Sequence, residues 1–189
     1  MAKVYEFLAN GFEEIEGLAP VDILRRGGVT VNTVSITGSK EVHTSHGVTV
    51  LADLRIEDVA SFDDADMLLL PGGMPGSTNL DSCQQVKDAL LKQNAKGKRI
   101  GAICAAPMVL GHLGLLKGRK ATCSPGFENH LEGAEYTAEL YQEDGNIITG
   151  EGPAATLPYA YKILGYFVDS EEVKKLQKKM QYAHLMEKR

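Results

Sequence analysis

The sequence contains no tryptophan, only three cysteines and no excess of basic residues. The lack of tryptophan excludes no class of fold. An odd number of cysteines without close pairs excludes a disulfide framework and fits a reducing compartment. A formal net charge of -5 argues against nucleic acid as a partner, because it offers no basic surface to the phosphates. No Cys-x-x-Cys pair and no histidine cluster is present, so we expect no metal site.

Long apolar runs are also missing from the chain. No stretch of about 18 apolar residues could span a membrane, and the N-terminus lacks the basic-then-apolar pattern of a signal peptide. We therefore expect a soluble, cytoplasmic protein without a membrane partner. What is present is ordinary globular composition, with 43% hydrophobic and 24% charged residues in 189. This composition fits a single domain over residues 1–189 with one sizeable core.

Apolar strand patterns alternate along the chain with patterns of helical spacing. This alternation predicts an α/β fold, in which a mostly parallel central sheet is covered by helices on both faces. Residues 41–51 read as a small hairpin on the edge of the sheet or as a decorated loop, and Asp144-Gly145 predicts a second hairpin over 136–149. The expected strands cover 4–8, 30–36, 67–70 and the segment that ends at Cys104, and the expected helices cover 13–26, 81–96, 107–113, 154–164 and 170–186.

Two local features stand out against this pattern. Glu6 lies in the middle of the first expected strand, although a central parallel strand is normally apolar on both faces. The sequence indicates no role for Glu6. The last helix is expected to open on a capping box, in which Asp169 is followed three positions later by Glu172.

The stretch from Lys98 to Met108 reads as strand, sharp turn and helix, with Cys104 on the turn. The flanking alanines are small enough for such a bend, and Pro107 fits the first turn of a helix. Because a helix N-terminus favours an anion, we expect the Cys104 thiol to ionise more readily than a free thiol. The alternative is that Cys104 is a small buried apolar residue that closes a core strand.

Four unusual turns in the sequence each follow an expected strand. In a parallel sheet the carboxyl ends of the strands lie along one edge, and ligands bind along that edge. We therefore expect these turns to meet around Cys104. They cover residues 10–16, 71–79, 104–107 and 123–126.

Five motifs occur in order along the chain: LANGFEEIE, LLLPGGMPG, IGAICAAP, KATCSPGFE and ITGEGPAAT. Together they closely resemble the ThiJ/PfpI family, the family of the Parkinson-associated protein deglycase and its bacterial relatives, over nearly the whole chain. The resemblance implies a flavodoxin-like three-layer sandwich and a homodimer. No cofactor is expected, because the glycine-rich segment 72–76 matches neither a phosphate loop nor the dinucleotide-binding spacing.

The resemblance also implies site residues. Cys104 matches the reactive cysteine of the family, and Glu16 matches the glutamate that hydrogen-bonds it. A carboxyl kept protonated by burial could stabilise a thiolate and move protons for a substrate. The alternative for Glu16 is an acid that complements a helix dipole. The amides of Gly73 and Ala105 match an oxyanion pocket, although Gly73 also reads as a turn glycine. Other positions assigned to oxyanion or substrate binding are Gly72, Ser124, Gly152 and Pro153.

The sequence departs from the family pattern at two positions. Human-like members carry a histidine where this chain has Ser124, so His130 either substitutes for it or is a solvated loop residue. Peptidase-like members carry a histidine where this chain has Ala105, so no Cys–His pair of neighbours exists. His112 reads as structural. Cys123 reads as a buried strand residue or a resolving thiol.

Three functions follow as expectations from these residues. The leading one is a cofactor-independent enzyme that acts through Cys104 on small dicarbonyls or their adducts, as glyoxalases and deglycases do. The alternative is a redox-responsive chaperone or oxidative-stress sensor in which Cys104 is oxidised. A second alternative, an intracellular cysteine peptidase, is disfavoured by Ala105.

Overall fold

Seven strands form the central sheet, in the order β10-β11-β7-β6-β1-β2-β5. The structure is a computed structural model that describes residues 2–188. Every pairing in this sheet is parallel except that of β10 with β11. The predicted mostly parallel α/β sheet is therefore confirmed. The strands are β1 (Lys3–Leu8), β2 (Thr30–Ser35), β5 (Leu54–Arg55), β6 (Met67–Leu70), β7 (Arg99–Ile103), β10 (Tyr141–Asp144) and β11 (Ile147–Gly150).

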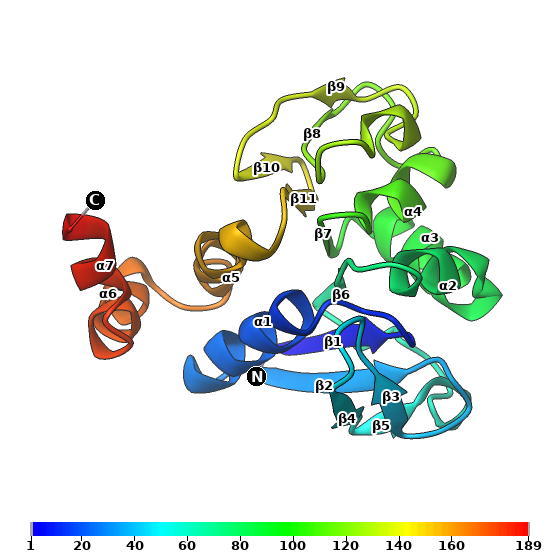
Figure 1. The fold of residues 1–189 in the computed structure, drawn as a ribbon, viewed down its shortest axis with the longest axis horizontal. Coiled ribbons are helices and arrows are strands. Elements are labelled where there is room, and N and C mark those ends of the chain that lie inside the picture. The colour runs from blue at the N-terminus through cyan, green and yellow to red at the C-terminus, as the bar shows by residue number, and fades with distance from the viewer. Residues whose placement is uncertain (1, 189) are drawn as a thin grey trace.

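Helices cover both faces of the sheet and complete a three-layer sandwich (Figure 1). One apolar core lies between the sheet and α1 (Glu14–Arg26) with α5 (Thr156–Leu164). The other lies between the sheet and α2 (Gly76–Ser82), α3 (Gln84–Ala95) and α4 (Pro107–His112). The four apolar residues of β6 alternate between the two cores, as expected for a strand covered on both sides.

The first helix shows how local sequence sets an element that carries the site. Glu13 is its N-cap, and the Glu13 carboxylate accepts a hydrogen bond of 2.8 Å from the Glu16 amide. Arg25 and Arg26 occupy the last turn, where positive charge complements the helix dipole. The capped first turn fixes the direction in which Glu16 enters the protein.

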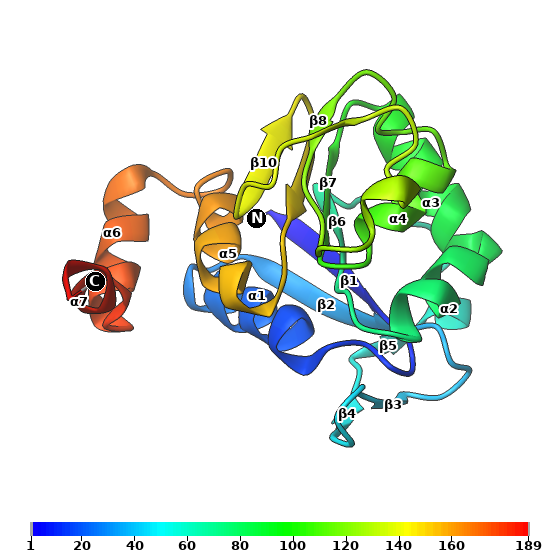
Figure 2. The ribbon, with the colours of Figure 1, turned by 45° about the horizontal axis from the view of Figure 1, so that its top comes forward.

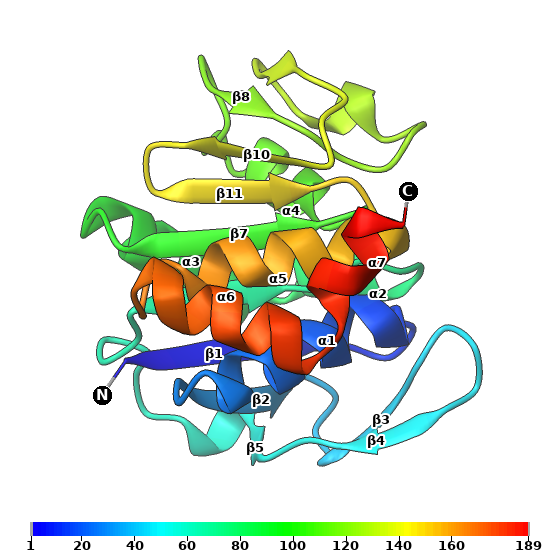
Figure 3. The same ribbon diagram turned by 90° about the vertical axis from the view of Figure 1, so that its left-hand side faces the viewer.

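Two helices differ from the sequence prediction. The expected helix over 81–96 is interrupted at Cys83, whose backbone is extended, and α2 before it begins at Gly76, inside the segment 71–79 that was expected to be a turn. The last expected helix is also divided, because Gln181 adopts a left-handed φ of 61° between α6 (Ser170–Lys179) and α7 (Tyr182–Glu187). The predicted cap is present, since Asp169 accepts hydrogen bonds from two amides of the first turn of α6. Figure 3 shows α6 and α7 on the outer side of α5.

The small hairpin over 41–51 exists, but its predicted position on the sheet edge is wrong. Its strands, β3 (Glu41–His43) and β4 (Thr49–Leu51), form a separate two-stranded sheet. A bridge from Phe12 to Thr44 ties this hairpin to the segment before α1, and Figure 2 shows it apart from the main sheet. The second predicted hairpin is confirmed as β10 and β11, whereas residues 135–136 form β9, which pairs with β8 (Lys120–Ala121).

Short 3₁₀ helices and loops complete the fold. They are η1 (Ile56–Asp58), η2 (Glu128–His130) and η3 (Pro153–Ala155). No helix within residues 2–188 is both long and apolar enough to cross a lipid bilayer. The parallel strands β1, β6, β7 and β11 end at the same edge of the sheet, so the segments that follow them meet there.

Candidate active site

Cys104 lies directly after β7 on a strained turn. Its φ is 64°, a left-handed conformation that costs a non-glycine residue about 1–2 kcal/mol. The turn is held from both sides, because the Cys104 amide donates to the Gly150 carbonyl (2.9 Å) and the Cys104 carbonyl accepts from the Ser124 amide (2.9 Å). The predicted sharp turn is therefore present. Cys104 is only half-buried, so it does not simply close a core strand.

Glu16 lies in the first turn of α1 and is fully buried. Its Oε2 atom accepts a hydrogen bond of 3.0 Å from the Gly72 amide, in the loop after β6. Its Oε1 atom is also buried and has no well-oriented hydrogen-bond partner within residues 2–188. One carboxylate oxygen is therefore fixed by the backbone, and the other remains for the neighbouring thiol or a substrate.

Gly72 packs against both side chains of the pair. A methyl group added at Gly72 would lie 2.6 Å from the Cys104 Cβ and 2.6 Å from Glu16 Oε2. A Cβ atom does not approach other atoms this closely, so only glycine fits beside the acid and the cysteine. The structure brings Cys104, Glu16 and Gly72 together, and the Glu16 carboxyl is close enough to hydrogen-bond the thiol.

Gly73 is constrained by its backbone as well as by its surroundings. Its φ is 87°, and an added methyl group would lie 2.4 Å from the Glu13 amide nitrogen. The Gly73 amide lies close enough to the Cys104 thiol to hydrogen-bond it. The Ala105 amide donates to no acceptor within the part of the chain that the structure describes. The Gly73 amide is thus placed to receive negative charge beside the thiol, and the oxyanion role of Ala105 stays a prediction.

Burial is the main influence on the acid of the pair. It raises the pKa of the Glu16 carboxyl to about 7, against the opposing effect of hydrogen bonding with Cys104. The nearby charge of Glu13 raises this pKa as well, and the Gly72 amide lowers it. A carboxyl with a pKa near neutrality can both donate and accept a proton at physiological pH.

Burial and, after it, the adjacent Glu16 carboxylate raise the pKa of the Cys104 thiol to about 12. Hydrogen bonds from the Gly73 amide and the Ser124 hydroxyl oppose this increase. The sequence prediction of a thiol that ionises more readily than a free thiol was wrong in direction. The short helix that begins at Pro107 does not outweigh burial beside an acid. Part of the increase comes from charge on Glu16, and protonation of Glu16 removes that part.

The remaining predicted site residues divide into two groups. Ser124 reaches the thiol, as its effect on the Cys104 pKa shows. Gly152 and Pro153 follow the end of β11, and no hydrogen bond within residues 2–188 joins them to Cys104. Cys123 is fully buried, and burial raises its pKa to about 12. It is a core residue, but the prediction that it lies in a strand is wrong, because β8 ends at Ala121.

His130, offered as a substitute for the family histidine, makes no hydrogen bond to Cys104 within residues 2–188. His130 hydrogen-bonds His112 instead (Nδ1 to Nε2, 3.1 Å). The Gly150 carbonyl, which holds the Cys104 amide, was missed by the sequence reasoning. Its only sequence signal is its position at the end of the strand next to β7.

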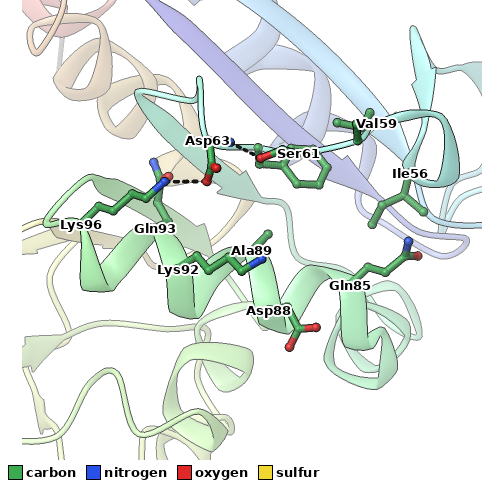
Figure 4. A pocket seen from close by; sticks show the side chains of 12 residues that line it. Ile56, Val59, Ser61, Asp63, Gln85, Asp88, Ala89, Lys92, Gln93 and Lys96 are labelled. Atoms are coloured by element: carbon green, nitrogen blue, oxygen red, sulfur yellow. Dashed lines mark hydrogen bonds and ion pairs between the residues drawn. The ribbon is translucent and has the colours of Figure 1, made fainter.

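A hollow of about 190 Å³ lies elsewhere, between α3 and the loop after η1 (Figure 4). It shares no residue with the Cys104 site, and Lys96 on its rim is paired with Asp63. The hollow therefore offers no catalytic group to Cys104.

One grouping within residues 2–188 has the composition of a metal site. Glu13, Glu14 and His46 each place one ligand atom within 4.8 Å of the others. These groups are otherwise engaged, because Glu13 caps α1 and Glu14 pairs with His46 at 3.1 Å. The sequence reasoning did not find this grouping, because His46 is brought to the start of α1 by the β3–β4 hairpin.

Comparison with known proteins decides the family. The family model of the DJ-1/PfpI family matches residues 2–165. The chain belongs to the DJ-1/PfpI family. This confirms the resemblance that the five motifs predicted, and the strained cysteine and buried glutamate of this DJ-1/PfpI chain lie within the matched range.

DJ-1/PfpI relatives match most of the chain. Protein dj-1beta of Drosophila melanogaster is 35% identical over 179 residues, which cover 94% of this chain and 95% of that protein. The glutathione-independent glyoxalase DJR-1.2 of Caenorhabditis elegans is 30% identical over 168 residues, 88% of each chain. The chain spans only 39% and 43% of the longer DJ-1 homologs B and A of Arabidopsis thaliana, at 34% identity.

The fold also matches solved DJ-1 structures. Oxidized DJ-1 of Toxoplasma gondii superposes with a TM-score of 0.92 at 33% identity, covering 97% of this chain and 100% of that chain. A likeness of this extent confirms the flavodoxin-like sandwich.

Proposed function

We propose that the protein is a cofactor-independent enzyme that uses Cys104 to act on small dicarbonyls or their adducts. The observation that carries this proposal is the placement of the Glu16 carboxyl within hydrogen-bonding reach of the Cys104 thiol, beside Gly72, with burial raising the pKa of Glu16 to about 7. Such a pair supplies a nucleophile and a proton carrier in one place. The relative named as a glutathione-independent glyoxalase supports the same reaction class.

The pair acts as a unit because it retains one proton at neutral pH. Two adjacent anions are disfavoured in a buried site, so the proton resides on Glu16 when the sulfur is a thiolate. In that state the Glu16 carboxyl donates to the sulfur, and the Gly73 amide adds a second donor. The reactive form therefore depends on Glu16 rather than on the helix that follows Cys104.

With methylglyoxal as substrate, each step balances. The Cys104 sulfur adds to the aldehyde carbon, and the resulting oxyanion accepts hydrogen bonds from the amides of Gly73 and Ala105 before it takes a proton. Glu16, as carboxylate, removes the hydrogen from this carbon and returns it to the neighbouring carbonyl carbon, while the hydroxyl proton passes to the neighbouring carbonyl oxygen, which gives a thioester of the hydroxyacid. Water then hydrolyses the thioester, and lactate leaves with the thiol restored.

The proposal is tested by following lactate formation from methylglyoxal. Cys104→Ser should reduce turnover below detection, and Glu16→Gln should reduce it by at least about 100-fold, the usual contribution of a general acid–base group. Cys83→Ser is the matched control, since Cys83 is a free thiol in the break between α2 and α3. Unchanged turnover in Cys104→Ser would refute the assignment.

A redox sensor or chaperone is the second candidate function. The solved relative named as oxidized DJ-1 favours it, as does a half-buried cysteine beside amide donors and a carboxyl able to donate to an oxidised sulfur. Mild peroxide should then add oxygen mass at Cys104 and switch on protection of an aggregating client. Protection that is identical in Cys104→Ala after the same treatment counts against a sensor.

We also propose that the protein is a cytoplasmic homodimer. Large apolar side chains are exposed on α1 and on the neighbouring β3–β4 hairpin, including Ile15 (52% exposed) and Leu51 (71% exposed). Neighbouring exposed apolar groups favour association. Light scattering should give twice the chain mass for the parent, and a Leu51→Glu variant should shift toward monomer. Cell fractionation tests the compartment.

A further inference from the structure

Two hydrogen bonds in series connect three side chains from α2, α4 and η2, outside the Cys104–Glu16 pair. Asp81 Oδ2 lies 2.9 Å from His112 Nδ1, and His112 Nε2 lies 3.1 Å from His130 Nδ1. The two imidazole rings are edge to face, with centroids 5.2 Å apart, and Phe127 packs against the second ring. The sequence reasoning treated these histidines as unrelated.

The order of partners fixes the direction of the hydrogen bonds. The Asp81 carboxylate can only accept, so His112 donates through Nδ1–H. A neutral His112 then presents Nε2 as an acceptor, and His130 donates to it through Nδ1–H. The aspartate thereby orients His112, and His112 orients His130.

The loop that ends at His130 begins at Ser124 and is internally bonded. The Phe127 amide donates to the Ser124 carbonyl (3.1 Å), and the His130 amide donates to the Phe127 carbonyl (3.0 Å). The Glu128 carboxylate accepts from the Gly126 amide at 2.9 Å and 3.0 Å. A displacement at one end of this loop is therefore transmitted to the other.

Each end of the loop is anchored to the helix or turn that follows β7. At the far end, a methyl group added at Gly111 of α4 would lie 1.9 Å from the His130 carbonyl oxygen, so the two backbones are in direct contact. At the near end, the Ser124 amide donates to the Cys104 carbonyl (2.9 Å). The Ser124 hydroxyl lies within hydrogen-bonding reach of the Cys104 thiol.

We propose that Asp81, His112 and His130 are positioning residues that clamp the loop 124–130 and thereby hold the Ser124 hydroxyl against the Cys104 sulfur. His130 is bonded to His112 and makes no hydrogen bond to the Cys104 thiol within residues 2–188. The three hydrogen-bonded side chains, Asp81, His112 and His130, act on the thiol through Ser124 instead. This inference rests on the proposed role of Cys104, but its experiment requires no turnover.

The test uses His130→Ala and the conservative His130→Asn, whose side-chain amide can replace the Nδ1–H donor. The stability of the loop is measured by backbone amide hydrogen exchange of a peptide that covers residues 122–131. The reactivity of the Cys104 thiol is measured by its rate of alkylation with iodoacetamide. His130→Ala should speed exchange and change the alkylation rate by about fivefold, the size expected for one lost hydrogen bond. His130→Asn should restore both. His184→Ala, on α7, is the matched control.

Two further variants make the test decisive. His112→Ala breaks the same link from α4, which covers the case in which His130→Ala does not fold. In a Ser124→Ala background, His130→Ala should no longer change the alkylation rate, because the clamp acts through that hydroxyl.

If amide hydrogen exchange of the loop is unchanged in both His130→Ala and His112→Ala, these histidines do not hold the loop 124–130 in place, and the proposal is overturned. An alkylation change that persists without the Ser124 hydroxyl overturns the route through Ser124. Absence of lactate formation, with these exchange and alkylation results intact, would remove only the proposed function.

Discussion

Glu16 and Cys104 lie side by side against Gly72, where a methyl group would lie 2.6 Å from an atom of each side chain. The three residues follow different parts of the fold: Glu16 lies on α1, Gly72 follows β6 and Cys104 follows β7. Their convergence results from the parallel sheet, which brings the carboxyl ends of its strands to one edge. The chemistry of the site depends on how closely this glycine lets the acid approach the sulfur.

Gly72→Ala should therefore separate the pair. We expect the free energy of unfolding to fall by about 1–3 kcal/mol, the cost of overpacking a filled site, and lactate formation to be lost with it. Urea unfolding measures the first effect. Gly152→Ala is the stability control, because nothing lies within 4 Å of the position its methyl group would take. Equal stability losses in the two variants would contradict the tight packing at Gly72.

The strained φ of Cys104 predicts a stability difference that is independent of chemistry. Cys104→Gly should be more stable than Cys104→Ala by about 1 kcal/mol, because glycine adopts a φ of 64° without the penalty of a Cβ. Both variants should be inactive. Thermal unfolding of the two proteins provides the comparison. A less stable glycine variant would show that the turn does not strain residue 104.

Glu6 predicts a pH dependence of stability. This carboxyl is buried in β1, and burial raises its pKa well above 4.5, its usual value. A raised pKa means that the folded protein holds the proton more tightly than the unfolded chain. The contribution to stability is full below pH 4.5 and declines as pH rises toward the folded pKa.

Glu6→Gln removes this dependence and retains the shape of the side chain. The difference in unfolding free energy between Glu6→Gln and the parent should therefore grow in favour of the variant from pH 5 to pH 8. The limiting slope for one group is about 1 to 1.5 kcal/mol per pH unit. Parallel curves for the two proteins would show that Glu6 is not held neutral.

The sequence was sufficient for the layers, the sheet and most strands, because local patterns determine them. Residues 67–70 were predicted with both ends correct, since an unbroken apolar run stops at Pro71. The short helix α2 before Cys83 was not predictable, because its sequence, GSTNLDS, has the composition of a loop. The position of the β3–β4 hairpin depends on the bridge from Phe12 to Thr44, which joins segments that no local pattern relates.

The candidate site was only partly predictable for the same reason. The turn geometry of Cys104 is local, and small neighbours with a following proline are enough to indicate it. The direction of its pKa shift is set by burial beside Glu16, which requires the packing of α1 onto the loop after β6. The bond from His112 to His130 joins residues 18 positions apart on separate elements, and neither position shows a pattern that pairs them.

The most direct test of the shared proton is the rate of Cys104 alkylation as a function of pH in the parent and in Glu16→Gln. Two coupled groups titrate in two steps, so the parent should show a first rise near pH 7, where Glu16 titrates, and a second at higher pH. Glu16→Gln should show one step and lack the rise near pH 7. Superimposable profiles for the two proteins would contradict the claim that Glu16 and Cys104 act as one unit.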